Sequence, residues 1–351
     1  MKATPDRNIV FGPERKIFRR RFGLAADPGS GKVTLMETRM LGSLWPVSVL
    51  TIGGGGIGQV WGSTNRSESV ATLREAVDSG ITLVDVAPSY GDGEAETVLG
   101  DAFHGSLPAG LRIGTKHHVG NAPASEIGEA MQRSLEQSLA RMKVDFVDLF
   151  FLHSPIVPDD SQGTDTRTPL ALFREVARPA LDNLVERGLV GAWGITGAHP
   201  PSTVIPVLGE EPSPAAMQVV ANALNSPGDM AWSDEPPRLR DLIASAVTRG
   251  IGVMGIRALQ AGALTNAIDR ELPGDHWVAA DFERAVPFRA LAAEMGETPA
   301  SLAYRYALSV EGVDTVVLGV KNRTELKEAL ESERSGVLSA EEVALIDGLK
   351  L

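Results

Sequence analysis

Eight stretches typical of buried strands alternate with helical stretches from about residue 47 to residue 331. Short apolar runs of this kind indicate parallel strands that are buried on both faces. The expected strands cover residues 47–52, 81–86, 111–116, 146–153, 190–196, 215–220, 251–256 and 313–318. The expected helices cover residues 67–79, 95–103, 125–141, 170–187, 202–208, 239–249, 281–295, 299–309 and 324–331, with a last helix at 340–349. Eight strand–helix units predict an α/β fold, a closed (β/α)8 TIM barrel, which typically needs about 250 residues.

A doubly wound open sheet is the alternative arrangement of the same units. It would normally carry the motif G-x-G-x-x-G directly after its first strand, with an acidic residue about 20 positions later. Gly53, Gly55 and Gly58 match that spacing, but the sequence that follows them does not open a helix. We therefore expect these glycines to form a flexible loop at the mouth of a barrel.

Composition narrows the possible partners and sites. The chain has 351 residues and no cysteine, which excludes disulfides, thiolate metal ligands and a cysteine nucleophile. Its formal net charge of −12 argues against nucleic acid or an anionic membrane as a partner. No apolar run approaches the roughly 18 residues of a membrane span, and no secretory signal is evident. We expect a cytoplasmic protein and assign no metal ligands.

Residues 1–35 differ from the rest, because they hold eight basic and three acidic residues without clean periodicity. We expect a flexible, basic N-terminal extension ahead of a single barrel domain at residues 36–351. An upstream start codon, with Met36 as the true start, is an equivalent explanation. A mitochondrial presequence is a weaker one, since acidic residues interrupt the basic run.

Four ionisable side chains lie at or just beyond the ends of consecutive predicted strands. Asp85 and Tyr90 belong to the second strand and the turn after it, Lys116 ends the third, and His153 ends the fourth. In a barrel, all the carboxyl ends surround one cavity, where such enzymes carry out their chemistry. A buried lysine must be paired or neutral, and Asp85 is its natural partner. We expect the lysine to lower the pKa of the tyrosine, which makes Tyr90 a candidate general acid.

The motifs around these residues resemble those of the aldo-keto reductases, from about residue 36 to residue 330. Residues 80–91 read GITLVDVAPSYG, the most diagnostic match, and residues 94–100 read EAETVLG. The segments GTK at 114–116 and DLFFLH at 148–153 supply the rest of the tetrad. Residues 36–42 are similar to the opening hairpin of that family, and VLGVKNRTELKE at 317–328 is similar to its adenosine-phosphate segment.

This resemblance implies a TIM barrel that binds NAD(P)H in an extended form without a Rossmann domain. It implies that Tyr90 donates the proton to a carbonyl group and that Lys116 and Asp85 adjust the pKa of the Tyr90 hydroxyl. It also implies that His153 orients the carbonyl. The cofactor-binding residues implied by the same resemblance are Thr196, Gln218, Ile256, Arg257, Gly319, Lys321, Arg323 and Glu328. Lys321 and Arg323 add positive charge beside the phosphate segment, which favours NADP(H) over NAD(H).

Three departures from the family pattern concern the cofactor. Thr196-Gly197 stands where the family has Ser-Asn, and Gly197 has no carboxamide. Ile256-Arg257 replaces a Tyr-Ser pair; Ile256 is expected to pack on the nicotinamide, and Arg257 to reach the pyrophosphate. Ala329 stands where an asparagine is usual. The cofactor preference is therefore open.

We expect an NAD(P)H-dependent reductase or dehydrogenase that interconverts a small aldehyde, ketone or sugar and its alcohol or lactone. The alternative is a catalytically idle, cofactor-binding regulatory subunit on the same barrel. A lyase or isomerase is a third possibility. The physiological substrate, the reaction direction and the oligomeric state do not follow from the sequence.

Overall fold

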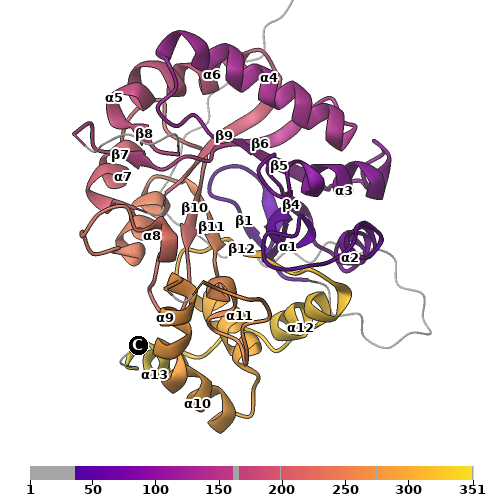
Figure 1. Cartoon of the computed structure of the whole chain (residues 1–351), viewed down its shortest axis with the longest axis vertical. Coiled ribbons are helices and arrows are strands. Elements are labelled where there is room, and N and C mark those ends of the chain that lie inside the picture. Colours follow the sequence, from indigo (N-terminus) through magenta and orange to yellow (C-terminus); the bar gives the residue numbers. More distant parts are fainter. Residues whose placement is uncertain (1–35, 161–165, 198, 274, 350) are drawn as a thin grey trace, which may run out of the picture. The chain divides into compact units, whose positions relative to one another are not determined.

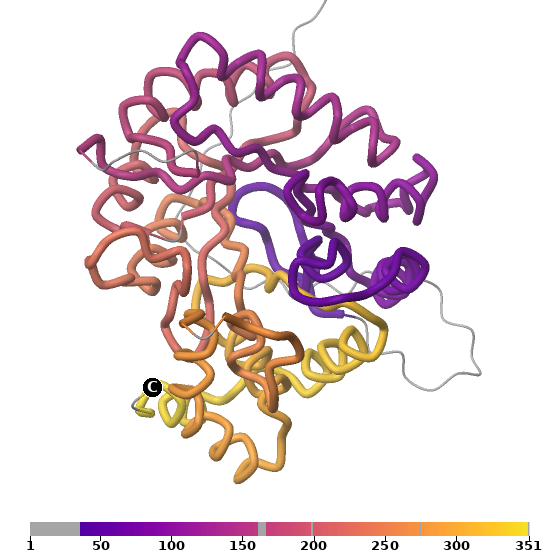
Figure 2. The backbone as a smooth tube through the Cα atoms, in the orientation of Figure 1, coloured from indigo at the N-terminus to yellow at the C-terminus, as the bar shows by residue number. Residues whose placement is uncertain are grey.

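The computed structural model describes residues 36–160, 166–197, 199–273, 275–349 and 351. Eight parallel strands close into one barrel, which confirms the predicted (β/α)8 fold (Figure 1). The order around the barrel is β3 (Leu50–Gly53), β4 (Leu83–Asp85), β5 (Arg112–His117), β6 (Val147–Leu152), β9 (Val190–Thr196), β10 (Ala216–Val220), β11 (Gly252–Ile256) and β12 (Thr315–Leu318). The barrel closes where Val316 pairs with Leu50, so the first and last strands lie side by side (Figure 2). The predicted extension, residues 1–35, lies outside the described residues.

Helices follow the strands because their apolar faces pack against the barrel wall. They are α2 (Arg66–Asp78), α3 (Glu94–Phe103), α4 (Ala124–Met142), α5 (Leu170–Leu172), α6 (Arg178–Glu186), α7 (Pro201–Leu208), α8 (Leu239–Thr248), α11 (Pro299–Ser309), α12 (Arg323–Arg334) and α13 (Ala340–Asp347). The expected helix at 170–187 is continuous but contains a π-helical turn at Phe173–Ala177. Within the described part of the chain, no helix is long and apolar enough to cross a membrane.

The helix expected at 281–295 is in fact two helices, α9 (Trp277–Arg284) and α10 (Val286–Glu294). The division falls at Ala285, directly before the Val286-Pro287 start of α10. A proline lacks the N–H that a helix interior needs but is tolerated in a first turn, so the chain restarts there. The periodicity alone did not separate two helices joined so closely.

The strand expected at 47–52 is also divided. Its first part belongs to β2 (Pro46–Ser48), which pairs with β1 (Thr38–Met40) in an antiparallel hairpin, and its second part is β3. Leu41 and Val47 of this hairpin pack with Leu83, Leu149 and Met254 inside the barrel. The hairpin also bonds to the loops before β11 and β12, so it closes the amino-terminal end of the barrel. The opposite end remains available for a site.

The glycine-rich stretch after β3 forms a buried helical turn, α1 (Gly54–Ile57), so the expectation of a flexible loop is wrong. The reason is the close approach of the backbone after β12. A Cβ atom on Gly56 would lie 2.0 Å from the carbonyl oxygen of Val320 and 2.4 Å from that of Gly319. Only glycine fits where two backbones meet this closely.

We predict that Gly56→Ala lowers the free energy of unfolding by about 1–3 kcal/mol, because the added methyl group forces one of the two backbones to move. Gly128→Ala is the matched control, since Gly128 lies in α4 with open space around its Cβ position. That change should raise stability by about 0.5–1 kcal/mol. Urea unfolding of both variants measures this, and equal effects would contradict the packing argument.

Candidate active site

A buried ion pair joins the ends of two neighbouring strands. The Lys116 Nζ donates to Asp85 Oδ2 at 2.7 Å and to the carbonyl oxygen of Val86 at 2.8 Å. Both side chains are almost fully buried. Register places Gly114 opposite Asp85, and a Cβ atom there would approach Asp85 Oδ1 to 3.4 Å. The predicted pairing of Asp85 with Lys116 is therefore present.

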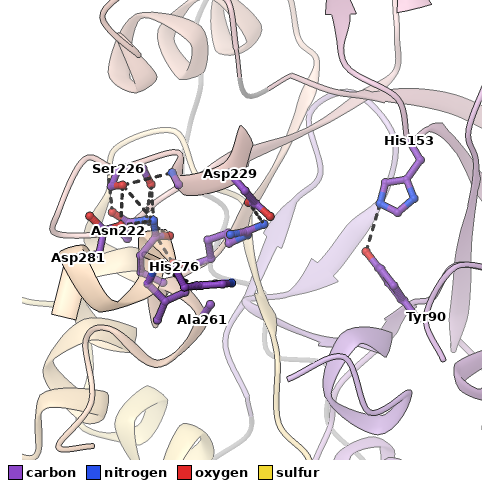
Figure 3. A network of polar contacts seen from close by, with 12 residues as sticks. Tyr90, His153, Asn222, Ser226, Asp229, Ala261, His276 and Asp281 are labelled. Carbon is purple, nitrogen blue, oxygen red and sulfur yellow. Dashed lines mark hydrogen bonds and ion pairs between the residues drawn. The ribbon is translucent and has the colours of Figure 1, made fainter. Parts of the chain in front are cut away.

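Tyr90 and His153 lie directly beside this ion pair. The Tyr90 hydroxyl lies 3.5 Å from His153 Nε2, and the two rings meet edge to face with their centroids 5.6 Å apart (Figure 3). Lys116 Nζ lies 4.9 Å from the centroid of the Tyr90 ring. The structure therefore brings together all four tetrad residues predicted from the sequence.

The electrostatics differ from the sequence expectation in one respect. Burial raises the pKa of the Tyr90 hydroxyl, and the opposing effect of Lys116 does not reverse it. The expectation that the lysine yields a lowered tyrosine pKa is wrong here, because desolvation of the phenolate outweighs one nearby cation. Burial lowers the pKa of Lys116, but Asp85 and Tyr90 raise it further than burial lowers it, so the ammonium stays charged.

Burial also lowers the pKa of His153 well below its usual range, and Lys116 and His118 act in the same direction. His153 is therefore neutral at physiological pH. His118 was missed by the sequence analysis, although it stands two residues after Lys116. Its ring lies against that of His153, tilted by 32° with the centroids 4.2 Å apart, and lines the same pocket. The available signal was its position just beyond the end of a barrel strand.

The tetrad lies at a pocket of about 700 Å³ at the carboxyl ends of the strands. Asp85, Tyr90 and His153 line it, whereas Lys116 lies beneath them. Seven predicted cofactor residues line it too: Thr196, Gln218, Ile256, Arg257, Gly319, Lys321 and Glu328. A pocket with this lining joins the tetrad to the segment after β12.

The eighth predicted cofactor residue, Arg323, does not reach this pocket. It begins α12 and forms a two-pronged ion pair with Glu68 of α2, and its side chain is 53% exposed. Lys321 does line the pocket, where it pairs with Asp269 and with Glu325 at 2.9 Å. Glu328 accepts a hydrogen bond from the Thr298 hydroxyl at 2.6 Å. One cation, not two, therefore faces this end of the pocket from the 321–323 segment.

Several buried polar groups in the pocket lining have no hydrogen-bond partner among the described residues. Two of them are the Thr196 hydroxyl and Arg257 Nη1. Buried polar groups are normally paired, so both fit a ligand rich in oxygen, such as a dinucleotide. The departure at Gly197 also has a packing cause, because a Cβ atom there would lie 2.3 Å from the sulfur of Met217.

Arg257 is held in place by a polar network that the sequence analysis did not anticipate (Figure 3). Arg257 bonds to Asp229 at 2.7 Å and lies over the rings of Trp61 and Trp277. Behind it, buried Gln260 donates to Asp281 at 2.8 Å and accepts from Asn222 at 2.9 Å. This network fixes the loops after β10 and β11 against α9.

The fold and the site together are those of a TIM-barrel enzyme, with titratable groups gathered at the carboxyl ends of its strands. Among the described residues, no group of three or more His, Asp or Glu side chains is arranged to hold a metal ion. A model of the aldo/keto reductase family matches residues 49–350. The chain belongs to the aldo/keto reductase family.

Individual relatives are distant. L-Galactose dehydrogenase of Arabidopsis thaliana is 26% identical over 302 residues, covering 84% of this chain and 88% of the relative. L-Glyceraldehyde 3-phosphate reductase of Escherichia coli is 26% identical over 321 residues, covering 83% and 86%. The structure of a glycerol dehydrogenase from Gluconobacter oxydans superposes with a TM-score of 0.67 at 24% identity, covering 89% of this chain and 94% of that one. The last of these supports the fold alone.

We predict that Lys116→Met lowers the free energy of unfolding by about 3–5 kcal/mol, because it leaves the buried Asp85 carboxylate without its partner. The double variant Asp85→Leu, Lys116→Met should lose less, since no uncompensated charge remains. Denaturant unfolding at neutral pH compares the two. A double variant less stable than the single one would contradict this explanation. It would show that the loss does not come from an uncompensated buried charge.

Proposed function

We propose that this protein is an NAD(P)H-dependent oxidoreductase that interconverts a small carbonyl compound or sugar and its alcohol or lactone. The observation that carries the proposal is the convergence of the Tyr90 hydroxyl, His153 Nε2 and the Lys116–Asp85 pair at one pocket. When bound, the reduced nicotinamide supplies the hydride. The chain supplies the proton and holds the carbonyl.

Tyr90 acts as the general acid in reduction and as the base in the reverse direction. Its raised pKa keeps the hydroxyl protonated at neutral pH, which is the form that reduction needs. The charged Lys116 beside the ring stabilises the phenolate that remains after the proton has left. Asp85 keeps that lysine charged, and neutral His153 is placed to hydrogen-bond the carbonyl oxygen that receives the proton.

The same pocket suits a dinucleotide, and its lining suggests which residues would hold each part. Thr196 ends β9 and Gln218 lies in β10. Both would hold the nicotinamide amide, with Ile256 packed on the ring. Arg257, with an unpartnered buried nitrogen, would meet the pyrophosphate. Gly319 and Lys321 would hold the adenosine phosphate and Glu328 the adenine amine.

We also propose a preference for NADP(H) over NAD(H), carried by Lys321 alone. Lys321 lines the pocket between two carboxylates, whereas Arg323 lies outside it on Glu68. A 2′-phosphate would take over the pairing that the carboxylates of Asp269 and Glu325 now provide. The idle-subunit alternative has no specific support, because Asp85, Tyr90, Lys116 and His153 lie together at the pocket.

The names of the relatives narrow the substrate only to a class. They are named for acting on a sugar and on a three-carbon phosphorylated aldehyde, which agrees with a small carbonyl compound or sugar here. Both chains differ from this one at about three positions in four. We therefore propose the class and not either of those compounds.

We predict that Tyr90→Phe lowers the rate of carbonyl reduction by about 10²–10⁴-fold, since the ring stays but the proton donor is lost. The dissociation constant of NADPH, measured by fluorescence titration, should stay within about twofold, because no pocket contact other than the hydroxyl changes. A variant that reduces carbonyls at the original rate would refute the assignment of Tyr90.

We predict that Lys321→Ala weakens NADPH binding by about tenfold or more and NADH binding far less, since one charge-assisted contact with the 2′-phosphate disappears. Arg323→Ala is the matched control and should leave both affinities unchanged, as the Glu68 pair lies outside the pocket. Equal loss of both cofactors in Lys321→Ala would contradict the phosphate assignment.

A further inference from the structure

A tyrosine on α11 presents an unused hydroxyl at the pocket. Tyr304 lines the pocket and is 3% exposed, and its hydroxyl has no hydrogen-bond partner among the described residues. The unpartnered Thr196 hydroxyl is sealed off by the atoms around it, whereas the Tyr304 oxygen is not. Ala300, one helical turn earlier on α11, lines the same pocket, so this face of the helix points into it. A buried phenol with an open, unpaired hydroxyl indicates a ligand group at that place.

The hydroxyl belongs to the part of the pocket that α11 and α12 form. These two helices pack side by side (Figure 1). Glu325 and Glu328 of α12 line the pocket together with Tyr304. Burial raises the pKa of the Tyr304 hydroxyl, and the charges of Glu325 and Glu328 raise it further. The phenol therefore keeps its proton at physiological pH and is available as a hydrogen-bond donor.

The carboxylates beside this hydroxyl differ in how far they are already used. Glu325 Oε2 accepts the backbone N–H of Lys321 at 2.9 Å, and Glu325 Oε1 lies 2.9 Å from Lys321 Nζ. Glu328 Oε1 accepts the Thr298 hydroxyl at 2.6 Å, but Glu328 Oε2 has no hydrogen-bond partner in the described part of the chain. The pocket-lining side chains of α11 and α12 thus leave one donor and one acceptor, the Tyr304 hydroxyl and Glu328 Oε2.

Adenine carries a matching pair of groups along its edge. Its 6-amino group donates, and the ring nitrogens on either side of that group accept. A carboxylate can only accept and a phenol can donate, so Glu328 suits the amine and the Tyr304 hydroxyl suits a neighbouring ring nitrogen. Ala329, next to Glu328, has no polar side-chain atom, so a second contact with the base has to come from another element. Tyr304 of α11 offers that contact.

We propose that Tyr304 is a further cofactor-binding residue, whose hydroxyl donates to a ring nitrogen of the adenine while Glu328 accepts from the 6-amino group. The two side chains together select adenine against a base that carries oxygen at position 6. This inference rests on the proposed binding of NAD(P)H and adds a residue that recognises the base. A purely apolar wall would need the ring of Tyr304 but not its hydroxyl.

Tyr304→Phe tests this, because it keeps the ring and removes the donor. Fluorescence titration compares NADPH with reduced nicotinamide hypoxanthine dinucleotide phosphate, in which oxygen replaces the 6-amino group. Wild-type protein should bind NADPH at least about tenfold more tightly than this analogue. In the variant, the dissociation constant of NADPH should rise about five- to tenfold and that of the analogue less than about twofold. The analogue is affected less because a carboxylate cannot hold its 6-oxygen, so its base is not positioned against the hydroxyl.

Tyr306→Phe is the matched control on the same helix. The Tyr306 hydroxyl accepts from Arg240 at 2.9 Å and donates to Asp347 of α13, and Tyr306 does not line the pocket. This variant should lower the melting temperature of the cofactor-free protein and leave both dissociation constants within about twofold. Tyr304→Phe should leave that melting temperature unchanged or raise it, because its hydroxyl has no partner to lose. A lower melting temperature with unchanged NADPH binding in Tyr304→Phe would assign the hydroxyl a structural role and overturn the proposal.

Glu328→Gln checks the acceptor of the pair independently. Its amide can donate to a 6-oxygen, so the preference for NADPH over the hypoxanthine analogue should shrink at least about fivefold. An unchanged preference in this variant, or equal weakening of both dinucleotides in Tyr304→Phe, overturns the proposal, since the contact would then lie on a sugar or a phosphate. Failure of wild-type protein to bind either NADPH or NADH would instead refute the proposed function itself.

Discussion

The buried contact between Lys116 and Asp85 is the interaction on which the site depends. Two ions taken out of water are tolerated only when each compensates the charge of the other and the remaining donors are also used. Here Lys116 donates both to Asp85 and to the Val86 carbonyl oxygen. The pair forms only if β4 and β5 lie in the observed register, with Gly114 leaving room beside the carboxylate. Strand register and catalytic geometry are therefore the same constraint.

That constraint also sets the division of the barrel into two ends. The hairpin of β1 and β2 fills the amino-terminal end with the apolar side chains of Leu41 and Val47. At the other end, two groups next to the Tyr90 phenol differ in charge. Lys116 is a cation, whereas His153 is neutral. Burial drives the histidine to neutrality and the carboxylate keeps the lysine charged. The site thus holds a proton donor and a hydrogen-bonding neutral group together.

The barrel and the tetrad could be predicted because both leave local signals in the sequence. Apolar runs mark strands buried on both faces, and the ends of such strands converge in a closed barrel, so Asp85, Lys116 and His153 were found from position alone. Contacts between distant segments leave no such signal. The turn at Gly54–Ile57 depends on the backbone at residue 320, and Arg323 is drawn away from the pocket by Glu68, which lies 255 positions earlier. The restart of a helix at Val286-Pro287 was visible in the sequence, but only the packing shows that it divides two helices.

The loop after β11 shows how the fold supports an unfavourable backbone near the pocket. Arg257, Gln260 and Ala261 all have positive φ, at 60°, 46° and 52°, a conformation that costs each non-glycine residue of the order of 1 kcal/mol. The buried amide of Gln260 offsets this cost through its bonds to Asn222, Ser226 and Asp281. The network joins three separate elements and reaches Arg257 through its main chain, since the Asn222 amide donates to the Arg257 carbonyl oxygen at 3.3 Å. A residue that replaces a small serine in the family pattern is thus held through its main chain by buried polar contacts and through its guanidinium by Asp229, Trp61 and Trp277.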